Sequence, residues 1–145
     1  MTEVDRVVYT LGTSTRTLEE FTALLKHLVV EVVVDVRRFP SSRFEYFRKE
    51  ELAKSLLGIG IDYGHLGEEL GGYRRGGYQA FLASEEFKRG LEKLERIAEE
   101  KKIAIVCAER LPWRCHRRFI GMELERRGWQ VIHVIDQKRS WIPRE

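Results

Sequence analysis

Short apolar runs rich in β-branched residues alternate with longer amphipathic stretches, and this alternation limits the possible folds more than any other feature of the chain. The runs at 31–36 (EVVVDV) and 103–107 (IAIVC) are almost continuously apolar, as expected of strands buried on both faces of a parallel sheet. Three more runs are interpreted as strands: 6–11, 61–66 and 130–135. Repeated strand–helix–strand units require right-handed crossovers, so we expect a mainly parallel sheet of about five strands.

Four amphipathic stretches are predicted to form the helices between these strands. Thr17 and Glu20 fit a capping box before the first helix, because each side chain can satisfy a backbone amide that the first turn leaves free. Apolar residues then follow at helical spacing as far as Leu28. The other predicted helices cover 50–57, 84–101 and 113–127. The predicted fold class is therefore α/β, a three-layer α/β/α sandwich with a Rossmann-like central sheet.

The composition is that of a globular protein of 145 residues, of which 43% are hydrophobic and 10% aromatic. No linker or repeat divides the chain, so residues 1–145 are expected to form one domain with a C-terminal tail at 136–145. The absence of a long apolar run and of a signal-peptide core predicts a cytoplasmic protein that does not enter a membrane. A charged fraction of 34% without any asparagine suggests a thermophilic source. The oligomeric state is not predicted.

Chemically active residues follow the predicted strands rather than precede them. In open parallel sheets, ligands bind beyond the carboxyl ends of the strands, where the strand ends meet at one edge. The residues at this edge are hydroxyl groups, glycines, acids, arginines and thiols: Gly12, Thr13 and Ser14 after the first strand, Asp35 and Arg37 after the second, His65, Gly71 and Gly72 after the third, and Cys107 and Glu109 after the fourth. We therefore expect a pocket at this edge of the sheet.

The same residues form motifs that resemble those of a known family. The motifs are GTS at 12–14, DVR at 35–37 with Phe39-Pro40, LGG at 70–72, CAE at 107–109 and CHR at 115–117. Together they are similar to the domain of unknown function 488 (DUF488), over about residues 7 to 135. The resemblance implies a pocket of this composition in a soluble protein and implies no particular reaction.

Four side chains are candidate catalytic residues. Cys107 is expected between a buried strand and a helix start, where the helix dipole and nearby arginines would favour its thiolate, although a buried cysteine can also be a small apolar core residue. Glu109 lies among arginines, which suits either a general base or a structural ion pair. His116 is interpreted as a proton shuttle or a surface histidine. Asp35 needs a partner such as Arg37, Arg117 or a backbone amide, so pairing and catalysis both remain open.

Arg37 and Arg117 are predicted to clamp an anion, because the guanidinium fork fits phosphate or carboxylate oxygens and a helix start adds free amides. The other predicted ligand-binding residues are Gly12, Thr13, Ser14, Gly71, Gly72 and Cys115. Further arginines and aromatic residues could form a rim that stacks bases and contacts a phosphate backbone, or else a solvated surface with some core aromatics: Arg38, Arg43, Arg48, Arg74, Arg75, Phe39, Phe44, Tyr46, Phe47, Tyr73 and Tyr78.

The cysteines leave two further alternatives open. Cys115 could form a disulfide with Cys107 or resolve its sulfenic acid, since thermophiles keep some intracellular disulfides. A metal site would have to use Cys107, Cys115, His116 and His65, but their spacing matches no standard zinc pattern and the arginines disfavour a cation. No metal or cofactor is therefore predicted.

These features support three hypotheses about function. The first is an enzyme or binder that acts on a phosphate-bearing ligand, such as a nucleotide or nucleic acid. The second is a non-catalytic module that binds a nucleotide or a single strand with the same arginines and aromatics. The third is a thiolate enzyme of the rhodanese or cysteine-phosphatase type with Cys107 as nucleophile. Trp113 stands where those enzymes place an arginine, and Pro112 removes an amide donor from the anion-binding loop.

Overall fold

Six strands form one sheet in the order β3-β2-β4-β1-β5-β6 in the computed structural model, which describes residues 6–72 and 74–142. Their bounds are β1 Val7–Gly12, β2 Val32–Asp35, β3 Asp62–His65, β4 Ile103–Cys107, β5 Gln130–Val134 and β6 Ser140–Trp141. The first five strands are parallel, and β6 is antiparallel to β5. The predicted α/β class with a mainly parallel sheet is confirmed, and the sixth strand comes from the segment predicted to be a tail.

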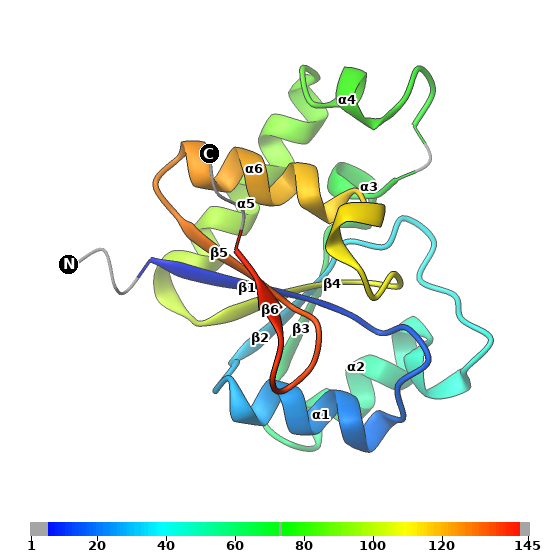
Figure 1. Ribbon diagram of the computed structural model, residues 1–145. Helices are drawn as coiled ribbons and strands as arrows, with labels where there is room; N and C mark the ends of the chain where they lie inside the picture. The colour runs from blue at the N-terminus through cyan, green and yellow to red at the C-terminus, as the bar shows by residue number, and fades with distance from the viewer. Residues whose placement is uncertain (1–5, 73, 143–145) are drawn as a thin grey trace.

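Helices cover both faces of the sheet (Figure 1). They are α1 Leu18–His27, α2 Lys49–Leu57, α3 Gly67–Leu70, α4 Tyr78–Phe81, α5 Glu85–Glu100 and α6 Arg117–Arg126. From β1 the chain runs to β2 and then to β3 at one edge of the sheet, and the helices of this part, α1 and α2, cover one face (Figure 1). The chain then returns through β4 to β5, and the helices of this second part, α3 to α6, cover the other face (Figure 1). Crossover connections between parallel strands are right-handed, so the helices move to the opposite face of the sheet when the chain reverses the direction in which it adds strands.

Side chains of the central strands alternate between two cores. In β4, Ile103, Ile105 and Cys107 face the core under α5 and α6, while Ala104 and Val106 face the core over α1 and α2. Every residue of β2 and β4 is buried, because helices cover both faces of the sheet. This two-sided burial explains why the two runs are almost continuously apolar in the sequence.

The predicted capping box at the start of α1 is confirmed. The Thr17 backbone N–H donates to Glu20 Oε1 at 2.8 Å, and the Glu20 backbone N–H donates to Thr17 Oγ1 at 3.0 Å. None of the helices in residues 6–72 and 74–142 is long and apolar enough to cross a membrane.

The predicted helix at 113–127 is wrong at its start. A short 3₁₀ helix covers Pro112–Arg114, Cys115 is extended with φ −131° and ψ 151°, and α6 begins only at Arg117. Proline fits the first turn of a helix because its ring fixes φ and it lacks an amide hydrogen. Here that turn is not continued, and the extended Cys115 separates it from α6.

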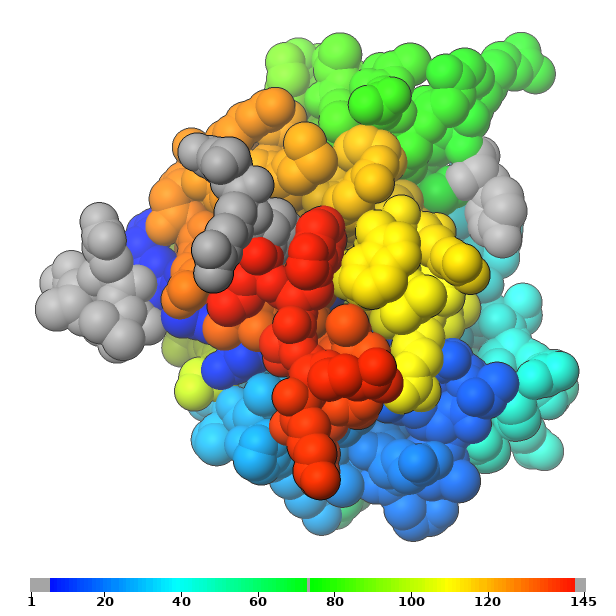
Figure 2. All heavy atoms as spheres, viewed as in Figure 1, coloured from blue at the N-terminus to red at the C-terminus, as the bar shows by residue number. Residues whose placement is uncertain are grey.

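The C-terminal segment folds back onto the sheet instead of forming only a tail. The Asp136 carboxylate accepts hydrogen bonds from the backbone N–H groups of Lys138 and Arg139 at 2.9 Å, which turns the chain so that β6 pairs with β5. The Trp141 ring lies 5.7 Å from the Trp113 ring and 5.2 Å from the His133 ring. The segments of the two tryptophans lie side by side on the face shown in Figure 2.

Candidate functional site

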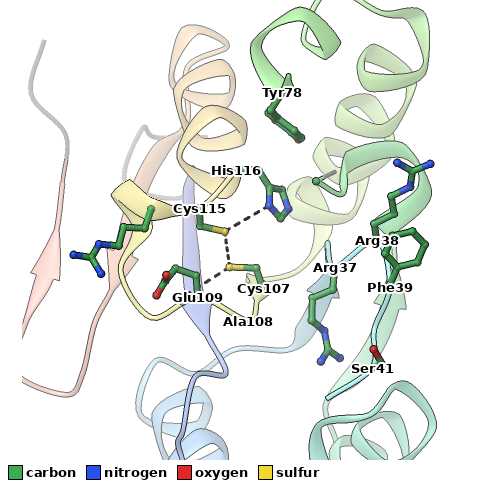
Figure 3. Close-up of a pocket in the computed structure, with 12 residues that line it drawn as sticks. Arg37, Arg38, Phe39, Ser41, Tyr78, Cys107, Ala108, Glu109, Cys115 and His116 are labelled. Carbon is green, nitrogen blue, oxygen red and sulfur yellow. Dashed lines mark hydrogen bonds between the residues drawn. The ribbon is translucent and has the colours of Figure 1, made fainter. Parts of the chain in front are cut away.

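A cleft of about 750 Å³ lies at the carboxyl ends of β2 and β4 (Figure 3). Its lining residues come from the segments after β2, β3 and β4: Arg37, Arg38, Phe39, Ser41, Gly72, Tyr78, Cys107, Ala108, Glu109, Arg114, Cys115 and His116. The chain leaves β2 toward α2 on one face of the sheet and leaves β4 toward α6 on the other (Figure 1). The two segments therefore diverge, and a crevice at such a point is the usual ligand position in α/β sheets.

The two cysteine side chains meet in this cleft. Cys107 ends β4 and is 1% exposed, whereas Cys115 is half-buried between the 3₁₀ helix and α6. Their Sγ atoms are 2.7 Å apart, and both thiols are free. The extended backbone at Cys115 lets its side chain return to the end of β4, which a continuous helix from residue 113 would not do. The site is thus a dithiol within reach of disulfide formation.

The two thiols differ in acidity. The pKa of Cys115 is lowered to about 4, chiefly because the Cys107 thiol donates a hydrogen bond to its sulfur, and further because of His116 and the Arg117 backbone N–H. Burial raises the pKa of Cys107, which keeps its proton. The sequence predicted thiolate character at Cys107, and the geometry instead gives it to Cys115, which lies at the amino end of α6.

His116 is held with one ring nitrogen toward the thiols. Its Nε2 lies 3.1 Å from the Val36 carbonyl oxygen, which can only accept, so Nε2 carries the hydrogen. The other nitrogen, Nδ1, therefore faces Cys115 Sγ at 3.6 Å with a free lone pair. The imidazole can take the thiol proton and form an imidazolium–thiolate pair, as the predicted proton shuttle requires. The Tyr78 ring packs on it at 5.2 Å.

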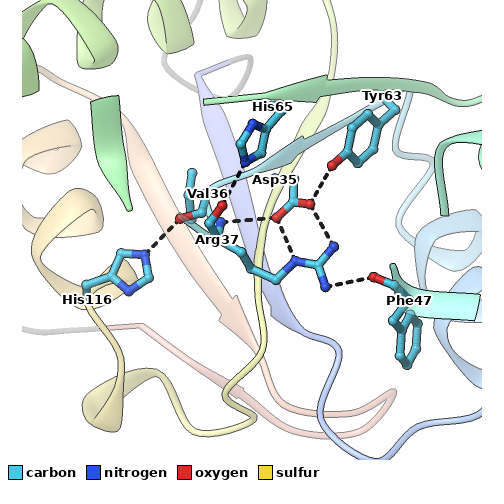
Figure 4. Close-up of polar contacts among 7 residues, drawn as sticks. All are labelled: Asp35, Val36, Arg37, Phe47, Tyr63, His65 and His116. Atoms are coloured by element: carbon cyan, nitrogen blue, oxygen red, sulfur yellow. Dashed lines mark hydrogen bonds and ion pairs between the residues drawn. The ribbon is translucent and has the colours of Figure 1, made fainter. Parts of the chain in front are cut away.

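Asp35 and Arg37 form a buried ion pair at the end of β2 (Figure 4), and Arg37 is also among the residues that line the cleft. Asp35 Oδ1 accepts from Arg37 Nε at 2.9 Å, and Oδ2 accepts from Arg37 Nη2 at 2.7 Å and from the Tyr63 hydroxyl at 2.5 Å. Arg37 Nη1 donates to the Phe47 carbonyl at 2.7 Å. Burial acts to lower the pKa of Arg37, but the bonds and charge of Asp35 outweigh this effect and raise it.

This network accounts for the partner that Asp35 was predicted to need. It also turns the Arg37 guanidinium away from the two thiols (Figure 3). The geometry favours a structural role for both residues, since the guanidinium bonds protein groups through all three nitrogens.

Arg117, the other half of the predicted clamp, lies behind the cleft wall rather than in the lining. Its side chain is fully buried, and Nη2 donates to the Arg110 carbonyl at 2.9 Å. Nε and Nη1 have no hydrogen-bond partner among the residues that the structure describes. The two predicted clamp arginines are therefore not brought together around a common ligand position.

Comparison with known proteins agrees with the motifs at this edge of the sheet. Residues 17–124, from α1 into α6, match the family described as "Domain of unknown function DUF488". The chain belongs to the DUF488 family. The matched residues include every residue that lines the cleft. No curated protein matches the chain.

In this DUF488 chain the GTS segment at 12–14 holds the backbone of the turn after β4 and does not line the cleft. The backbone N–H groups of Thr13 and Ser14 donate to the carbonyls of Cys107 and Ala108, each at 2.8 Å. A Cβ atom at Gly12 would lie 1.9 Å from the Glu109 carbonyl oxygen, so only glycine allows this approach. None of the three residues is among those that line the cleft.

Of the two glycines predicted after β3 to bind a ligand, one lines the cleft and the other has a packing role. Gly72 lines the cleft, and a Cβ atom there would lie 3.3 Å from the His116 ring. Gly71 is buried, and its missing side chain makes room for the Gly67 carbonyl and for Arg38. Only Gly72 is placed where it could contact a ligand.

Glu109 lines the cleft next to the thiols (Figure 3). Its Oε2 accepts a hydrogen bond from the Leu111 backbone N–H at 3.3 Å, which stabilises the turn after β4. The predicted general base is thus within the site and also has a local structural contact.

Several lining residues were not among the principal sequence candidates. Arg38, Phe39 and Tyr78 were expected only in an extended rim, whereas Ser41, Ala108 and Arg114 were not selected. Five of them lie in the segments that follow β2 and β4, and this position was the available signal; Tyr78 lies in α4, after β3. Other rim candidates pack into the core over α1 and α2, namely Phe44, Tyr46 and Phe47. Tyr73 lies outside the described residues.

Within residues 6–72 and 74–142, no three His, Cys, Asp or Glu side chains are grouped so that they could hold a metal ion. His65, considered as a ligand from the sequence, donates from Nε2 to the Arg37 carbonyl at 2.7 Å. The chemistry available in the cleft is that of the two thiols, His116, Glu109 and the surrounding cations.

Proposed function

We propose that this DUF488 protein is a dithiol–disulfide oxidoreductase, with Cys115 as the attacking thiolate and Cys107 as the resolving thiol. The observation that carries the proposal is the 2.7 Å separation of the two sulfurs inside a ligand-sized cleft. An accessible low-pKa thiol at a helix start, paired with a buried thiol of high pKa, is the arrangement that dithiol exchange requires.

The reaction proceeds in two exchange steps. The Cys115 thiolate attacks one sulfur of a substrate disulfide, a mixed disulfide forms, and the first substrate thiolate leaves. The leaving thiolate takes the proton of Cys107, whose sulfur then attacks Cys115 Sγ and releases the second substrate thiolate. The substrate gains two electrons, and the protein pair is oxidised to the Cys107–Cys115 disulfide. An external thiol reductant of the cytosol restores the dithiol by the reverse exchange.

The substrate is proposed to be a small anionic disulfide. Arg38 and Arg114 line the cleft together with His116, and Glu109 is the carboxylate among the lining residues. Phe39, which lines the same cleft, is 62% exposed as a residue and offers an apolar surface to the substrate body. Arginine side chains bind carboxylate groups through a planar donor fork.

The other hypotheses from the sequence stay predictions that use the same cleft. For a phosphate-bearing nucleotide or a single strand, the cleft offers Arg38, Arg114 and Phe39 in place of the predicted clamp of Arg37 and Arg117. A rhodanese-type enzyme would use Cys107 as nucleophile, and its high pKa and 1% exposure make Cys115 the better choice. We favour dithiol exchange because it gives both sulfur atoms a role.

The experiment mixes the reduced protein with three small disulfides that differ in charge: anionic glutathione disulfide, neutral bis(2-hydroxyethyl) disulfide and cationic cystamine. The release of substrate thiol is followed with time. We expect the anionic disulfide to react fastest, and Arg114→Gln to slow it by about two- to fivefold, as for an exposed ion pair worth up to about 1 kcal/mol. Cys115→Ser should abolish the reaction, whereas Cys107→Ser should accumulate the mixed disulfide at Cys115.

Three outcomes would contradict the proposal. Binding of the disulfide without release of thiol would favour the non-catalytic module. Full activity in Cys115→Ser together with loss in Cys107→Ser would favour a nucleophile of the rhodanese type. Equal rates for the three disulfides would remove the claim that the substrate is anionic.

A further inference from the structure

The position of His116 offers more than disulfide exchange requires. In that reaction the substrate thiolate leaves as an anion, because the pKa of an ordinary thiol is only about 8.5. The leaving group therefore needs no proton donor at the moment of exchange. His116 Nδ1 nevertheless lies 3.6 Å from Cys115 Sγ, and once it has taken the thiol proton it carries a hydrogen beside the reacting sulfur.

The imidazole is held in this position from three sides. Nε2 of His116 donates to the Val36 carbonyl at 3.1 Å (Figure 4), and the Tyr78 ring packs on the imidazole at 5.2 Å. A Cβ atom at Gly72 would lie 3.3 Å from Nδ1, so the glycine leaves room for the ring. His116 is therefore a fixed proton donor in the wall of the cleft.

Other titratable groups that line the cleft are less suited to give a proton to a substrate. The Tyr78 hydroxyl already donates to the Leu70 carbonyl at 2.6 Å, and burial raises its pKa. Glu109 Oε2 accepts a hydrogen bond from the Leu111 backbone N–H. Arginine side chains do not release protons in proteins. The geometry therefore favours His116 as the acid of this site.

The sulfur of Cys115 is also placed for oxidation. Cys115 is half-buried in the lining of the cleft, whereas Cys107 is 1% exposed, so an oxidant reaches Cys115 first. The Arg117 backbone N–H, at the start of α6, lies 3.5 Å from Cys115 Sγ and stabilises negative charge there. Cys107 Sγ lies 2.7 Å from the same sulfur (Figure 3), so an oxidised Cys115 meets the second thiol with little movement of the backbone.

We infer that the cleft also reduces hydroperoxides, with Cys115 as the attacking thiolate, His116 as the acid that protonates the leaving oxygen, and Cys107 as the resolving thiol. An oxygen leaving group needs such an acid, because the pKa of water is about 15.7 and a hydroxide is a poor leaving group near neutral pH. The inference rests on the roles that the proposed function gives to the two cysteines, and it does not rest on a disulfide as the substrate.

The reaction consists of two balanced steps. The Cys115 thiolate attacks the terminal oxygen of the hydroperoxide, so that an S–O bond forms and the O–O bond breaks. The leaving alkoxide, or hydroxide if the substrate is hydrogen peroxide, takes the proton of the His116 imidazolium, and Cys115 becomes a sulfenic acid. Cys107 Sγ then attacks Cys115 Sγ, and the hydroxyl group leaves with the Cys107 proton as water. The peroxide has gained two electrons, and the external thiol reductant restores the dithiol from the disulfide.

The test compares two rates at Cys115 of the reduced protein: oxidation by hydrogen peroxide and alkylation by iodoacetamide, both followed by mass spectrometry. Both reactions consume the thiolate, but the iodide that leaves during alkylation needs no proton. The ratio of the two rates therefore isolates the effect of the proton donor. His116→Gln should lower this ratio by about a hundredfold, which is the low end of the usual contribution of a general acid.

His27→Gln is the matched control, because His27 is exposed on α1 and is not among the residues that line the cleft. Its ratio of oxidation to alkylation should equal that of wild type. An equal ratio in His116→Gln and wild type would overturn the inference.

A second measurement covers the case in which His116→Gln does not fold. Cys107→Ser is oxidised with hydrogen peroxide in the presence of dimedone, which labels a sulfenic acid. A dimedone adduct should form at Cys115, and the ratio of oxidation to alkylation should exceed that of free cysteine by about a hundredfold. A ratio equal to that of free cysteine would overturn the inference.

These measurements contain no disulfide substrate, so they separate this inference from the proposed function. Reduction of peroxide without reduction of any disulfide would support the inference and refute the proposed exchange activity. Reduction of disulfides without the His116-dependent reduction of peroxide would refute the inference alone.

Discussion

At the scale of single residues, the environments of three arginines assign them different roles. Arg37 bonds Asp35 and Phe47, and Arg114 is exposed at the cleft. Arg117 is buried, and no carboxylate in residues 6–72 and 74–142 forms an ion pair with it. The sequence predicted a partner for Asp35 because a charged group at the end of a buried strand needs one. It could not predict that the Arg37 guanidinium would bond only protein groups and so leave the anion site, because the choice of partner depends on the direction of the Arg37 side chain.

Removing the charge of Asp35 should therefore affect stability more than chemistry. Asp35→Asn leaves Arg37 buried without its counter-ion, and we expect a loss of about 3–5 kcal/mol in the free energy of unfolding. Tyr63→Phe is the milder comparison, because it removes one hydrogen bond to Asp35 and should cost about 1 kcal/mol. Both values come from denaturant titration. Similar stabilities for wild type and Asp35→Asn would show that the pair is not a structural requirement.

At the scale of elements, the end of β1 and the turn after β4 must lie close together for the thiols to meet. The amides of Thr13 and Ser14 hold the carbonyls of Cys107 and Ala108, and Gly12 leaves room for the Glu109 carbonyl. The sequence indicated that these segments share one edge of the sheet. It did not indicate that one of them supports the other, since a glycine needed for packing and a glycine at a ligand look the same in a sequence.

This packing predicts the effect of a single methyl group. In Gly12→Ala the new Cβ would lie 1.9 Å from the Glu109 carbonyl oxygen, so the turn after β4 must move. We expect a loss of about 1–3 kcal/mol in stability and slower formation of the Cys107–Cys115 disulfide. Gly64→Ala in β3 is the control, because a Cβ there has nothing within 4 Å. The explanation is wrong if both variants form the disulfide as fast as wild type.

The residue at which α6 begins could not be predicted from the periodicity of apolar residues alone. The apolar spacing in 113–127 fits one continuous helix. In the structure Pro112 begins a 3₁₀ turn, and the extended backbone of Cys115 separates this turn from α6, which begins at Arg117. This interruption brings the second thiol to the first. The sequence prediction was least accurate where the proposed chemistry lies, because local propensity there yields to the geometry of the site.

At the scale of the whole molecule, the sheet order explains the position of the cleft. The five parallel strands were predictable from the apolar runs, and the edge of the sheet where the cleft lies was predictable from the residues that follow those runs. The sixth strand was not, because two residues carry too little periodicity to be recognised. The pairing of Cys107 with Cys115 was left open in the sequence, since it depends on how β4 and α6 meet.

A redox titration of the wild-type protein would show whether Cys107 and Cys115 act as one redox pair. The protein is equilibrated in dithiol buffers of increasing potential, free thiols are alkylated, and each cysteine is read by mass spectrometry. We expect one reversible two-electron transition to an intramolecular Cys107–Cys115 disulfide, with a midpoint in the range of known dithiol oxidoreductases, about −270 to −120 mV. Thiols that stay free throughout, or that form only disulfides between molecules, would show that the two cysteines are not a redox pair.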